Sequence, residues 1–322
     1  PGTYDVRISD AANPGCVITL NPALVITEPA VLAATVTPTM VTCFGANNGI
    51  ITITNASGGY GSYEYSINGG GTWTGLNTFS NLAPATYNVM MRDALNQSCE
   101  ITLDATLEIN QPDALSASLL KTDVTCFGSA DGTITITNPT GGYGTYEFSI
   151  NGGGAWQSSG DFTGLGPGYY NVITRDAAHP SCVIVLNNAL QITQPAVLNG
   201  VITTTMVTCN GANDGIITIN NPTGGYGTYE YSNDGGSTWQ GSGTFNNLQP
   251  ATYDVRIRDA VNKACVIILN PSVVITEPVV LSAAVGKTDI TCFGANDGRI
   301  VISSPSGGYG TYDYSVDGGT NW

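Results

Sequence analysis

Short runs of alternating apolar and polar residues recur along the chain. Residues 132–138 alternate isoleucine with threonine, residues 146–150 and 253–258 alternate in the same way, and residues 99–109 form the longest run. A period of two is typical of a strand with one buried face. Segments rich in Gly, Asn and Asp separate the runs, and no helical periodicity of useful length is present. The pattern therefore predicts an all-β fold.

The same pattern repeats with a period of 83 residues. Four cysteines keep this step, at Cys43, Cys126, Cys209 and Cys292, and so do Cys16, Cys99, Cys182 and Cys265. Tryptophans and Glu/Gln-Pro pairs follow the same register, at Trp73, Trp156, Trp239 and Trp322 and at Pro29, Pro112, Pro195 and Pro278. No insertion or deletion interrupts it, so the chain is an array of one repeated unit.

The repeat boundaries follow from the Pro positions. We expect complete repeats at residues 30–112, 113–195 and 196–278, the C-terminal part of a repeat at 1–29 and the N-terminal part of another at 279–322. The expectation is that this stretch is a window on a longer array, so the lack of a signal peptide says little about location.

A repeat of this size, with seven or so short strands, favours a tandem array of immunoglobulin-like β-sandwich repeats with an 83-residue period. Residues 248–253 suggest a tyrosine corner, with Tyr253 near the start of a strand. Propeller blades and solenoid coils are the competing interpretation, but their repeats are shorter. The Pro-containing boundary, such as residues 109–112, is expected to be a short stiff joint.

Composition then narrows the function. The chain of 322 residues has Lys+Arg 9 against Asp+Glu 24, a net charge of −15, and only 10% charged residues. A nucleic-acid partner requires a basic face to neutralise phosphates, so this class is excluded. No apolar run is long enough for a membrane span, so no membrane insertion is expected in this segment. The single histidine, His179, occurs in one repeat only, and no nucleophile is paired with a base, so we expect no enzyme.

Two cysteines per repeat indicate an oxidising compartment, hence an extracellular location. The candidates for structural disulfides are Cys43, Cys99, Cys126, Cys182, Cys209 and Cys265. Two pairings are open: one within a repeat, such as Cys126 with Cys182, and one across a boundary, such as Cys99 with Cys126. Because small domains usually cross-link themselves, we favour the pair within a repeat, although its two cysteines are expected near opposite ends of the sandwich.

Residues 232–239 and 315–322 match the Ser-x-Asp-x-Gly-x-x-Trp hairpin of sialidases, with Asn68 and Asn151 at the Asp position in two other repeats. The pattern predicts a turn in which Asp or Asn binds its own backbone, Gly takes a positive φ and Trp covers the hairpin. It is a structural motif, and the catalytic groups of a sialidase are not present.

A Gly-Tyr-Gly loop recurs with Tyr60, Tyr143, Tyr226 and Tyr309. A phosphate-binding loop would open a helix and carry Lys, so that function does not fit. Two interpretations remain: a tight turn whose tyrosines pack at the sandwich edge, or an exposed platform for sugar rings shared with the hairpin Trp73, Trp156 and Trp239. Repetition would serve the second through multivalency.

Acidic residues precede a glycine in three repeats, at Asp131, Asp214 and Asp297, with Asn48 in the other. Turn capping is the default interpretation. Calcium is the alternative, because it prefers clustered oxygen ligands, and Asp176 or Asp259 would then supply a further one. Otherwise no cofactor is expected.

The motifs in combination resemble the SprB repeat. They are Val-Thr-Cys-Phe-Gly-Ala-Asn-Asp-Gly, Ser-Gly-Gly-Tyr-Gly, Tyr-x-Tyr-Ser, Pro-x-Thr-Tyr-x-Val and Arg-Asp-Ala before a Cys, and the resemblance covers every repeat. The Gly-Gly-x-x-Trp hairpin is interpreted as an insert relative to a minimal copy. The resemblance implies a large cell-surface adhesin of gliding Bacteroidota, exported by the type IX secretion system.

Two functions are therefore expected. The first is a structural and adhesive stalk, an extracellular filament for surface attachment or gliding motility. Its partners would be neighbouring repeats, surface polysaccharide or a solid substratum, and the gliding or secretion machinery. The alternative is a multivalent carbohydrate-binding module that uses the Gly-Tyr-Gly loop and the hairpin Trp of each repeat.

Overall fold

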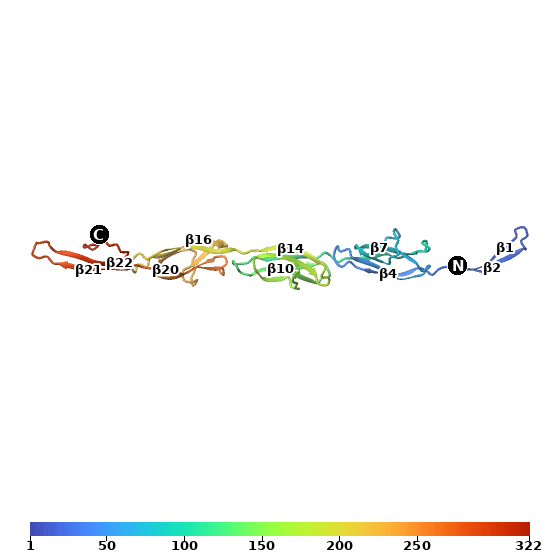
Figure 1. Ribbon diagram of the computed structural model, residues 1–322, viewed down its shortest axis with the longest axis horizontal. Helices are drawn as coiled ribbons and strands as arrows, with labels where there is room; N and C mark the ends of the chain where they lie inside the picture. The colour runs from blue at the N-terminus through green and yellow to red at the C-terminus, as the bar shows by residue number, and fades with distance from the viewer. The chain divides into compact units, whose positions relative to one another are not determined.

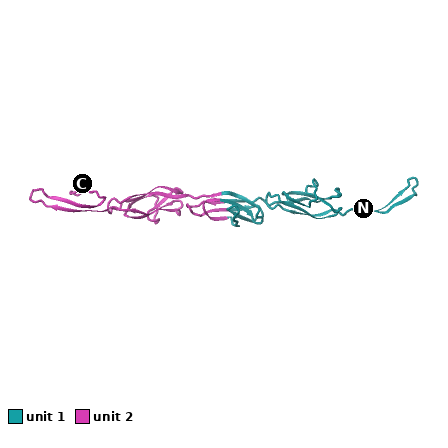
Figure 2. Cartoon of the chain, in the orientation of Figure 1, with its two compact units in different colours: residues 1–119, 136–160, 170–189 teal, residues 120–135, 161–169, 190–322 magenta.

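The computed structural model describes residues 1–322 and is all-β (Figure 1). It contains no helix that could cross a membrane. Two compact units divide the chain: residues 1–119, 136–160 and 170–189, and residues 120–135, 161–169 and 190–322 (Figure 2). The division passes through residues 113–195, so strands of that repeat belong to both units.

Residues 30–112 form two three-stranded antiparallel sheets. The strands are β3 (Ala33–Thr39), β4 (Gly49–Ser57), β5 (Tyr63–Ser66), β6 (Thr78–Leu82), β7 (Ala85–Asp93) and β8 (Glu100–Ile109). The sheet orders are β3-β4-β6 and β5-β7-β8. This is an immunoglobulin-like arrangement of strands A, B and E facing C, F and G. Six strands replace the expected seven, because the stretch between β5 and β6 forms a hairpin turn instead of a seventh strand.

The same orders recur in the next two repeats. In residues 113–195 the strands are β9 (Ser116–Thr122), β10 (Gly132–Thr140), β11 (Tyr146–Ser149), β12 (Asp161–Leu165), β13 (Gly168–Asp176) and β14 (Val183–Ile192). In residues 196–278 they are β15 (Ala196–Thr205), β16 (Gly215–Gly225), β17 (Tyr229–Ser232), β18 (Thr244–Leu248), β19 (Ala251–Asp259) and β20 (Val266–Ile275). The sheets are β12-β10-β9 with β11-β13-β14, and β15-β16-β18 with β17-β19-β20.

The remaining strands pair in two hairpins. β1 (Gly2–Ser9) pairs with β2 (Val17–Ile26), and β21 (Val279–Thr288) pairs with β22 (Arg299–Gly308). They hold the positions of the F–G and A–B pairs of a repeat.

The alternating pattern places the core as expected. Ile134 and Ile136 of β10 are buried, and so are Val255 and Ile257 of β19, whereas the threonines between the isoleucines of β10 are half-buried. In residues 30–112 and 196–278, one apolar cluster joins the inner faces of the two sheets. The predicted tyrosine corner is present: the Tyr253 hydroxyl donates to the Gln249 carbonyl oxygen at 2.9 Å.

The glycine at the start of the second strand of each complete repeat has a packing role in addition to the expected turn. A Cβ at Gly215 would lie 2.7 Å from Cγ2 of Ile275 and 2.9 Å from the Leu248 carbonyl oxygen. Only glycine lets the start of β16 approach both neighbours so closely. The Asp-Gly sequence is therefore a point of close packing.

Burial of these strands depends on the facing sheet. Ile257 is 0% exposed in β19, whereas Ile8, at the same position of the repeat in the β1–β2 hairpin, is 57% exposed. Ile257→Ala should lower the free energy of unfolding of residues 196–278 by about 2–5 kcal/mol, because it leaves a cavity. Ile8→Ala should change the stability of the β1–β2 hairpin by less than about 0.5 kcal/mol. Amide hydrogen exchange resolved by peptide measures both, and equal effects would contradict this account of the core.

Candidate functional site: the disulfide-linked joint between repeats

Three loops at the ends of each repeat make up the candidate site. The cysteine loop follows the first strand (residues 42–48, 125–131 and 208–214), and the Gly-Tyr loop precedes the third (residues 58–61, 141–144 and 224–227). The second-cysteine turn joins the last two strands (residues 94–99, 177–182 and 260–265). The first and last of these loops carry all the cysteines of a repeat.

The chain folds the cysteine loop through an Asp/Asn cap. Asp214 Oδ1 accepts from the Thr208 N–H at 2.8 Å, and its other oxygen accepts from the Thr208 hydroxyl. Asp131 and Asp297 bind Thr125 and Thr291 in the same way, and these bonds, the Thr hydroxyl first, lower the pKa of all three carboxyls. Asn48 caps the same turn in residues 42–48: its Oδ1 accepts from the Thr42 N–H, and its Nδ2 donates to the Thr42 hydroxyl. These residues are the predicted turn caps. No group of three or more His, Cys, Asp and Glu close enough to hold a metal is found.

The residue before each joint proline fastens the cysteine loop to the end of the last strand. Gln111 Oε1 accepts from the Gly45 N–H at 2.7 Å, and Gln194 and Glu277 do the same for Gly128 and Gly211. Nearby, the Val41 N–H donates to the Asn110 carbonyl oxygen at 3.0 Å. The Gln or Glu of each boundary is therefore bonded to the loop that carries the first cysteine of its own repeat.

A buried aspartate fastens the Gly-Tyr loop to the second-cysteine turn. Asp259 is 0% exposed; one carboxylate oxygen accepts from the Tyr226 N–H at 2.5 Å, and the other accepts from Val261 and Asn262. Asp93 makes the equivalent bonds, and that from the Tyr60 N–H contributes most to lowering its pKa. Asp176 and Asp259 therefore organise backbone N–H groups, a role that sequence reasoning missed.

Two disulfides link consecutive repeats. Cys43 pairs with Cys182 and Cys126 with Cys265, each over a sequence separation of 139 residues and with a Cα–Cα distance of 5.3 Å. The first cysteine of one repeat thus pairs with the second cysteine of the next. Each pair lies within one compact unit.

The favoured pairing within a repeat, Cys126 with Cys182, is wrong. The disulfides do cross between consecutive repeats, as in the alternative, but its example, Cys99 with Cys126, is not one of them. Cys99 precedes the ten-residue strand β8, whereas the Cys43 loop is bonded to residues just beyond the end of β8. A ten-residue strand is about 33 Å long, far beyond the 4.4–6.8 Å between bridged Cα atoms. Cys99 also lies one strand length away from the joint that follows it.

Four cysteines are free: Cys16, Cys99, Cys209 and Cys292. The step that relates the paired cysteines leads from Cys209 to a position after residue 322 and from Cys99 to a position before residue 1. Cys99 and Cys209, which were candidates for structural disulfides, form none in this structure.

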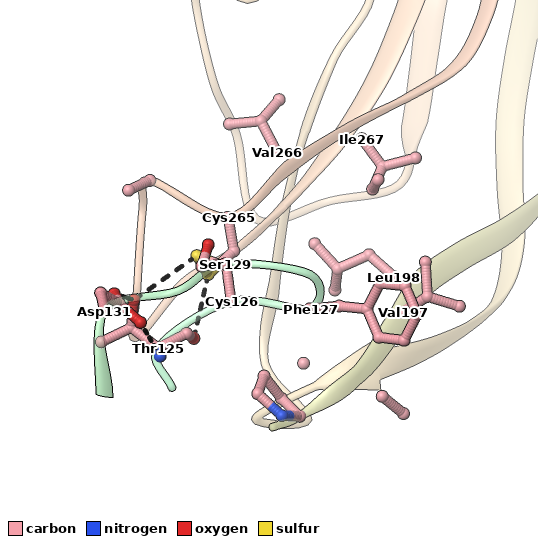
Figure 3. Close-up of a pocket in the computed structure, with 14 residues that line it drawn as sticks. Thr125, Cys126, Phe127, Ser129, Asp131, Val197, Leu198, Cys265, Val266 and Ile267 are labelled. Carbon is pink, nitrogen blue, oxygen red and sulfur yellow. Dashed lines mark hydrogen bonds between the residues drawn. A yellow bond between two sulfur atoms is a disulfide. The ribbon is translucent and has the colours of Figure 1, made fainter. Parts of the chain in front are cut away.

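A pocket of about 340 Å³ lies beside the second disulfide (Figure 3). Its lining includes Phe127 of the cysteine loop, Val197 and Leu198 of β15, and Val266 of β20. Figure 3 shows Thr125 and Asp131 in contact at one end of the pocket, near Cys126 and Cys265. Equivalent residues around Cys43 and Cys182 line a second pocket. The pocket is a recurrent feature of the joint.

The two tyrosines of the Gly-Tyr loop have different roles. The second closes the loop, as in Tyr229, whose hydroxyl donates to the Gly224 carbonyl oxygen at 3.1 Å. The first is exposed at 58%, 47%, 51% and 72% for Tyr60, Tyr143, Tyr226 and Tyr309. The Tyr226 hydroxyl nevertheless donates to the Thr125 carbonyl oxygen of the preceding repeat at 3.3 Å, and Tyr309 does the same to Val207 at 3.0 Å. Tyr226 and Tyr309 are therefore each part of a joint.

The hairpin tryptophans lie elsewhere, after the third strand of each repeat. Trp73, Trp156 and Trp239 are half-buried, and an arginine guanidinium lies over each ring at 4.5, 4.1 and 4.2 Å. For Trp239 this is Arg258, which also bonds Glu230 at 2.5 Å. Cation–π contact of this kind stabilises a folded surface. The recurrence of Glu and Arg at the repeat period is the sequence signal for this contact.

The predicted hairpin turn is confirmed. Asp234 Oδ1 accepts from the Thr238 N–H at 3.0 Å, Gly235 and Gly236 have φ of 73° and 89°, and the Trp239 ring nitrogen donates to the Gly236 carbonyl oxygen. Asn68 makes the same backbone bond in the first complete repeat. Desolvation opposes ionisation of Asp234, but hydrogen bonds from Ser232 and Thr238 outweigh it and lower its pKa to about 2.

Fold and joints together define a class: a tandem array of immunoglobulin-like domains whose neighbours are joined by disulfides. The family model described as SprB repeat matches residues 35–72, 120–155, 201–238 and 285–321. These four matches support the assignment of the chain to the SprB-repeat family. Each match ends at the residue before the hairpin Trp, so the Gly-Gly stretch lies inside the family pattern instead of being an insert.

Other comparisons add little. No curated protein matches the chain. It is similar to three N-terminal domains of the highly immunogenic outer capsid protein of bacteriophage RB49, with 10% identity and a TM-score of 0.31 over 86% of this chain and 97% of that one. It is also similar to domains 1–6 of the surface layer protein SbsC, with 11% identity and a TM-score of 0.23 over 98% and 55%. At these scores neither similarity bears on function.

The connectivity is directly testable. Digestion of the non-reduced protein should yield peptides that join Cys43 to Cys182 and Cys126 to Cys265, identified by mass spectrometry. The 5.3 Å Cα–Cα distances allow both bonds without backbone movement. Recovery of Cys126 with Cys182 as the main product would contradict the structure.

The hairpin of residues 196–278 should respond to acid. Because the folded pKa of Asp234, about 2, lies below its ordinary value of 3.8, its contribution to stability is present above pH 4 and is lost as the pH falls towards 2. Thr238→Val should raise this pKa towards 3.8, measured by NMR titration of the carboxyl carbon. The control is Thr72→Val, whose partner Asn68 does not titrate, so its effect on stability should not change with pH. An Asp234 pKa near 3.8 in the unsubstituted protein would refute the assignment.

Proposed function

We propose that the chain is a segment of the stalk of a long adhesin filament at the cell surface, acting in surface attachment or gliding motility. The observation that carries this proposal is the pairing of cysteines between consecutive repeats. SprB repeats occur in cell-surface proteins. Disulfides persist in oxidising compartments, which fits an extracellular location.

The mechanism is mechanical. Each complete repeat has a core between its own two sheets. The Tyr hydroxyl bond and the disulfide join consecutive repeats, while the Gln or Glu bond holds the cysteine loop within its own repeat. A covalent bond at the joint withstands loads that would separate a contact between loops. The proposed partners of the stalk segment are neighbouring repeats and the gliding and type IX secretion machinery. For the adhesin as a whole, they include a surface polysaccharide or solid substratum. We propose no catalytic role and no nucleic-acid partner.

The alternative is a multivalent carbohydrate-binding module, and one observation favours it. The first tyrosine of every Gly-Tyr loop is at least 47% exposed, at the same place in each repeat. Two observations favour the stalk: the Tyr226 and Tyr309 hydroxyls are bonded at a joint, and an arginine lies over each half-buried tryptophan.

Binding to immobilised agarose, cellulose and alginate separates the two functions. One variant has Tyr60, Tyr143, Tyr226 and Tyr309 changed to Ala, and its matched control has the same four changed to Phe. For a stalk, unsubstituted chain and both variants should show the same low retention on all three surfaces.

The carbohydrate-binding module would give a different result. Phe keeps the ring that stacks on sugars and loses only the hydroxyl that serves the joint. Specific retention that falls tenfold or more in the Ala variant but survives in the Phe variant would therefore replace the stalk with the binding module.

A further inference from the structure

The two disulfides close loops that overlap along the chain. One loop runs from Cys43 to Cys182 and the other from Cys126 to Cys265. Residues 126–182 belong to both. The joint peptides at residues 110–112 and 193–195 each lie in only one loop. This interlocked order differs from a row of separate loops, one per domain, in what happens when the ends of the chain are pulled.

We propose that tension on the chain is carried through the two disulfides and bypasses the peptide segments at the joints. From Cys43 the shortest covalent route crosses to Cys182, returns along the chain to Cys126, and crosses again to Cys265. It uses about 56 residues where the peptide alone has about 222. This inference rests on the stalk function, because only a tethered filament is loaded at its ends.

The loaded segment is the interior of the domain. Residues 126–182 contain β10 and β13, the central strands of their two sheets, together with β11 and β12. The edge strands β9 and β14, which connect directly to the joint peptides, are off the route. The central strands carry buried Ile134, Ile136 and Val172. Tension therefore enters the part of the repeat that is held by neighbours on both sides.

The same order makes the array tolerant of a cut. Any single break of the backbone between Cys43 and Cys265 lies inside at least one disulfide loop, so the two ends stay covalently joined. The two joints between complete repeats and many exposed turns, which proteases reach most easily, are within this range. The turn after β19, which contains Lys263, is an example, since this side chain is 60% exposed.

Single-molecule stretching tests the route. The starting protein carries Ser at Cys16, Cys99, Cys209 and Cys292, so that only the two disulfides remain, and is pulled from its ends until fully unfolded. Cys43→Ser/Cys182→Ser should add only about 27 residues, or about 95 Å, to the extended length at about 3.5 Å per residue. Opening the second pair in that variant should add the whole remaining loop of 139 residues, about 490 Å.

The unequal steps identify interlocked loops. If the cysteines paired within a repeat, the starting protein would hold only the loop from Cys126 to Cys182. Cys43→Ser/Cys182→Ser would then release about 56 residues, or about 195 Å, and opening the second pair would add nothing. Steps of that kind would overturn the proposal. They would leave the stalk function untouched, because the polysaccharide assay above measures adhesion and not the load path.

Limited trypsin digestion gives a second readout on the unsubstituted chain. A cut after Lys263 should leave the protein at full size on a non-reducing gel and release residues 264–322 only after reduction. In Cys126→Ser/Cys265→Ser the same cut should separate the pieces without reductant. A cut after Lys287, which is 75% exposed and outside both loops, is the internal control and should release its fragment in every case. Separation at Lys263 in the non-reduced unsubstituted chain would overturn the proposal.

Discussion

The length of the last strand in each repeat determines how this protein is held together. β8 and β20 have ten residues each, and the two cysteines of a repeat lie near opposite ends of this strand. Since a disulfide cannot cross that distance, a cysteine in such a repeat finds a partner only in a neighbour. The joint, its pocket and the overlap of the loops all follow from this separation.

Most of the hydrogen bonds near the joint order the loops that carry the cysteines. Gln194 and the Asp131 cap hold the loop of Cys126, while buried Asp259 holds the turn of Cys265 against the Gly-Tyr loop. Both loops are bonded within their own repeat, so the disulfide joins two ordered partners. By the chain-entropy model, closing a loop of 139 residues contributes about 5 kcal/mol, provided the native geometry is unstrained.

Local features were predictable from the sequence because they depend on near neighbours along the chain. Alternation at residues 132–138 predicted a half-buried strand, and the predicted tyrosine corner at Tyr253 and hairpin turn at Asp234 are both present. The disulfide pairing was not predictable, because the 83-residue period relates Cys126 in the same way to the second cysteine of every repeat. The choice depends on which ends of two domains meet.

Two further features lay outside what local patterns reveal. From the sequence, Asp176 and Asp259 were possible further ligands of a calcium ion. In the structure each is buried among backbone N–H groups from two separate loops. Tyr226 read as a residue of its own loop, but its hydroxyl reaches the preceding repeat. In both cases the missing information was the contact between segments distant in sequence.

The pairing of each first cysteine with the following repeat also determines the order in which the disulfides form as the chain is made. When a chain emerges with its N-terminus first, Cys43 has no correct partner until Cys182 has appeared and its turn has folded. The newest folded domain therefore always displays an unreacted thiol, and oxidation trails synthesis by one domain. Disulfides therefore form in order along the chain, and the first cysteine of each domain is oxidised only after the next domain has folded.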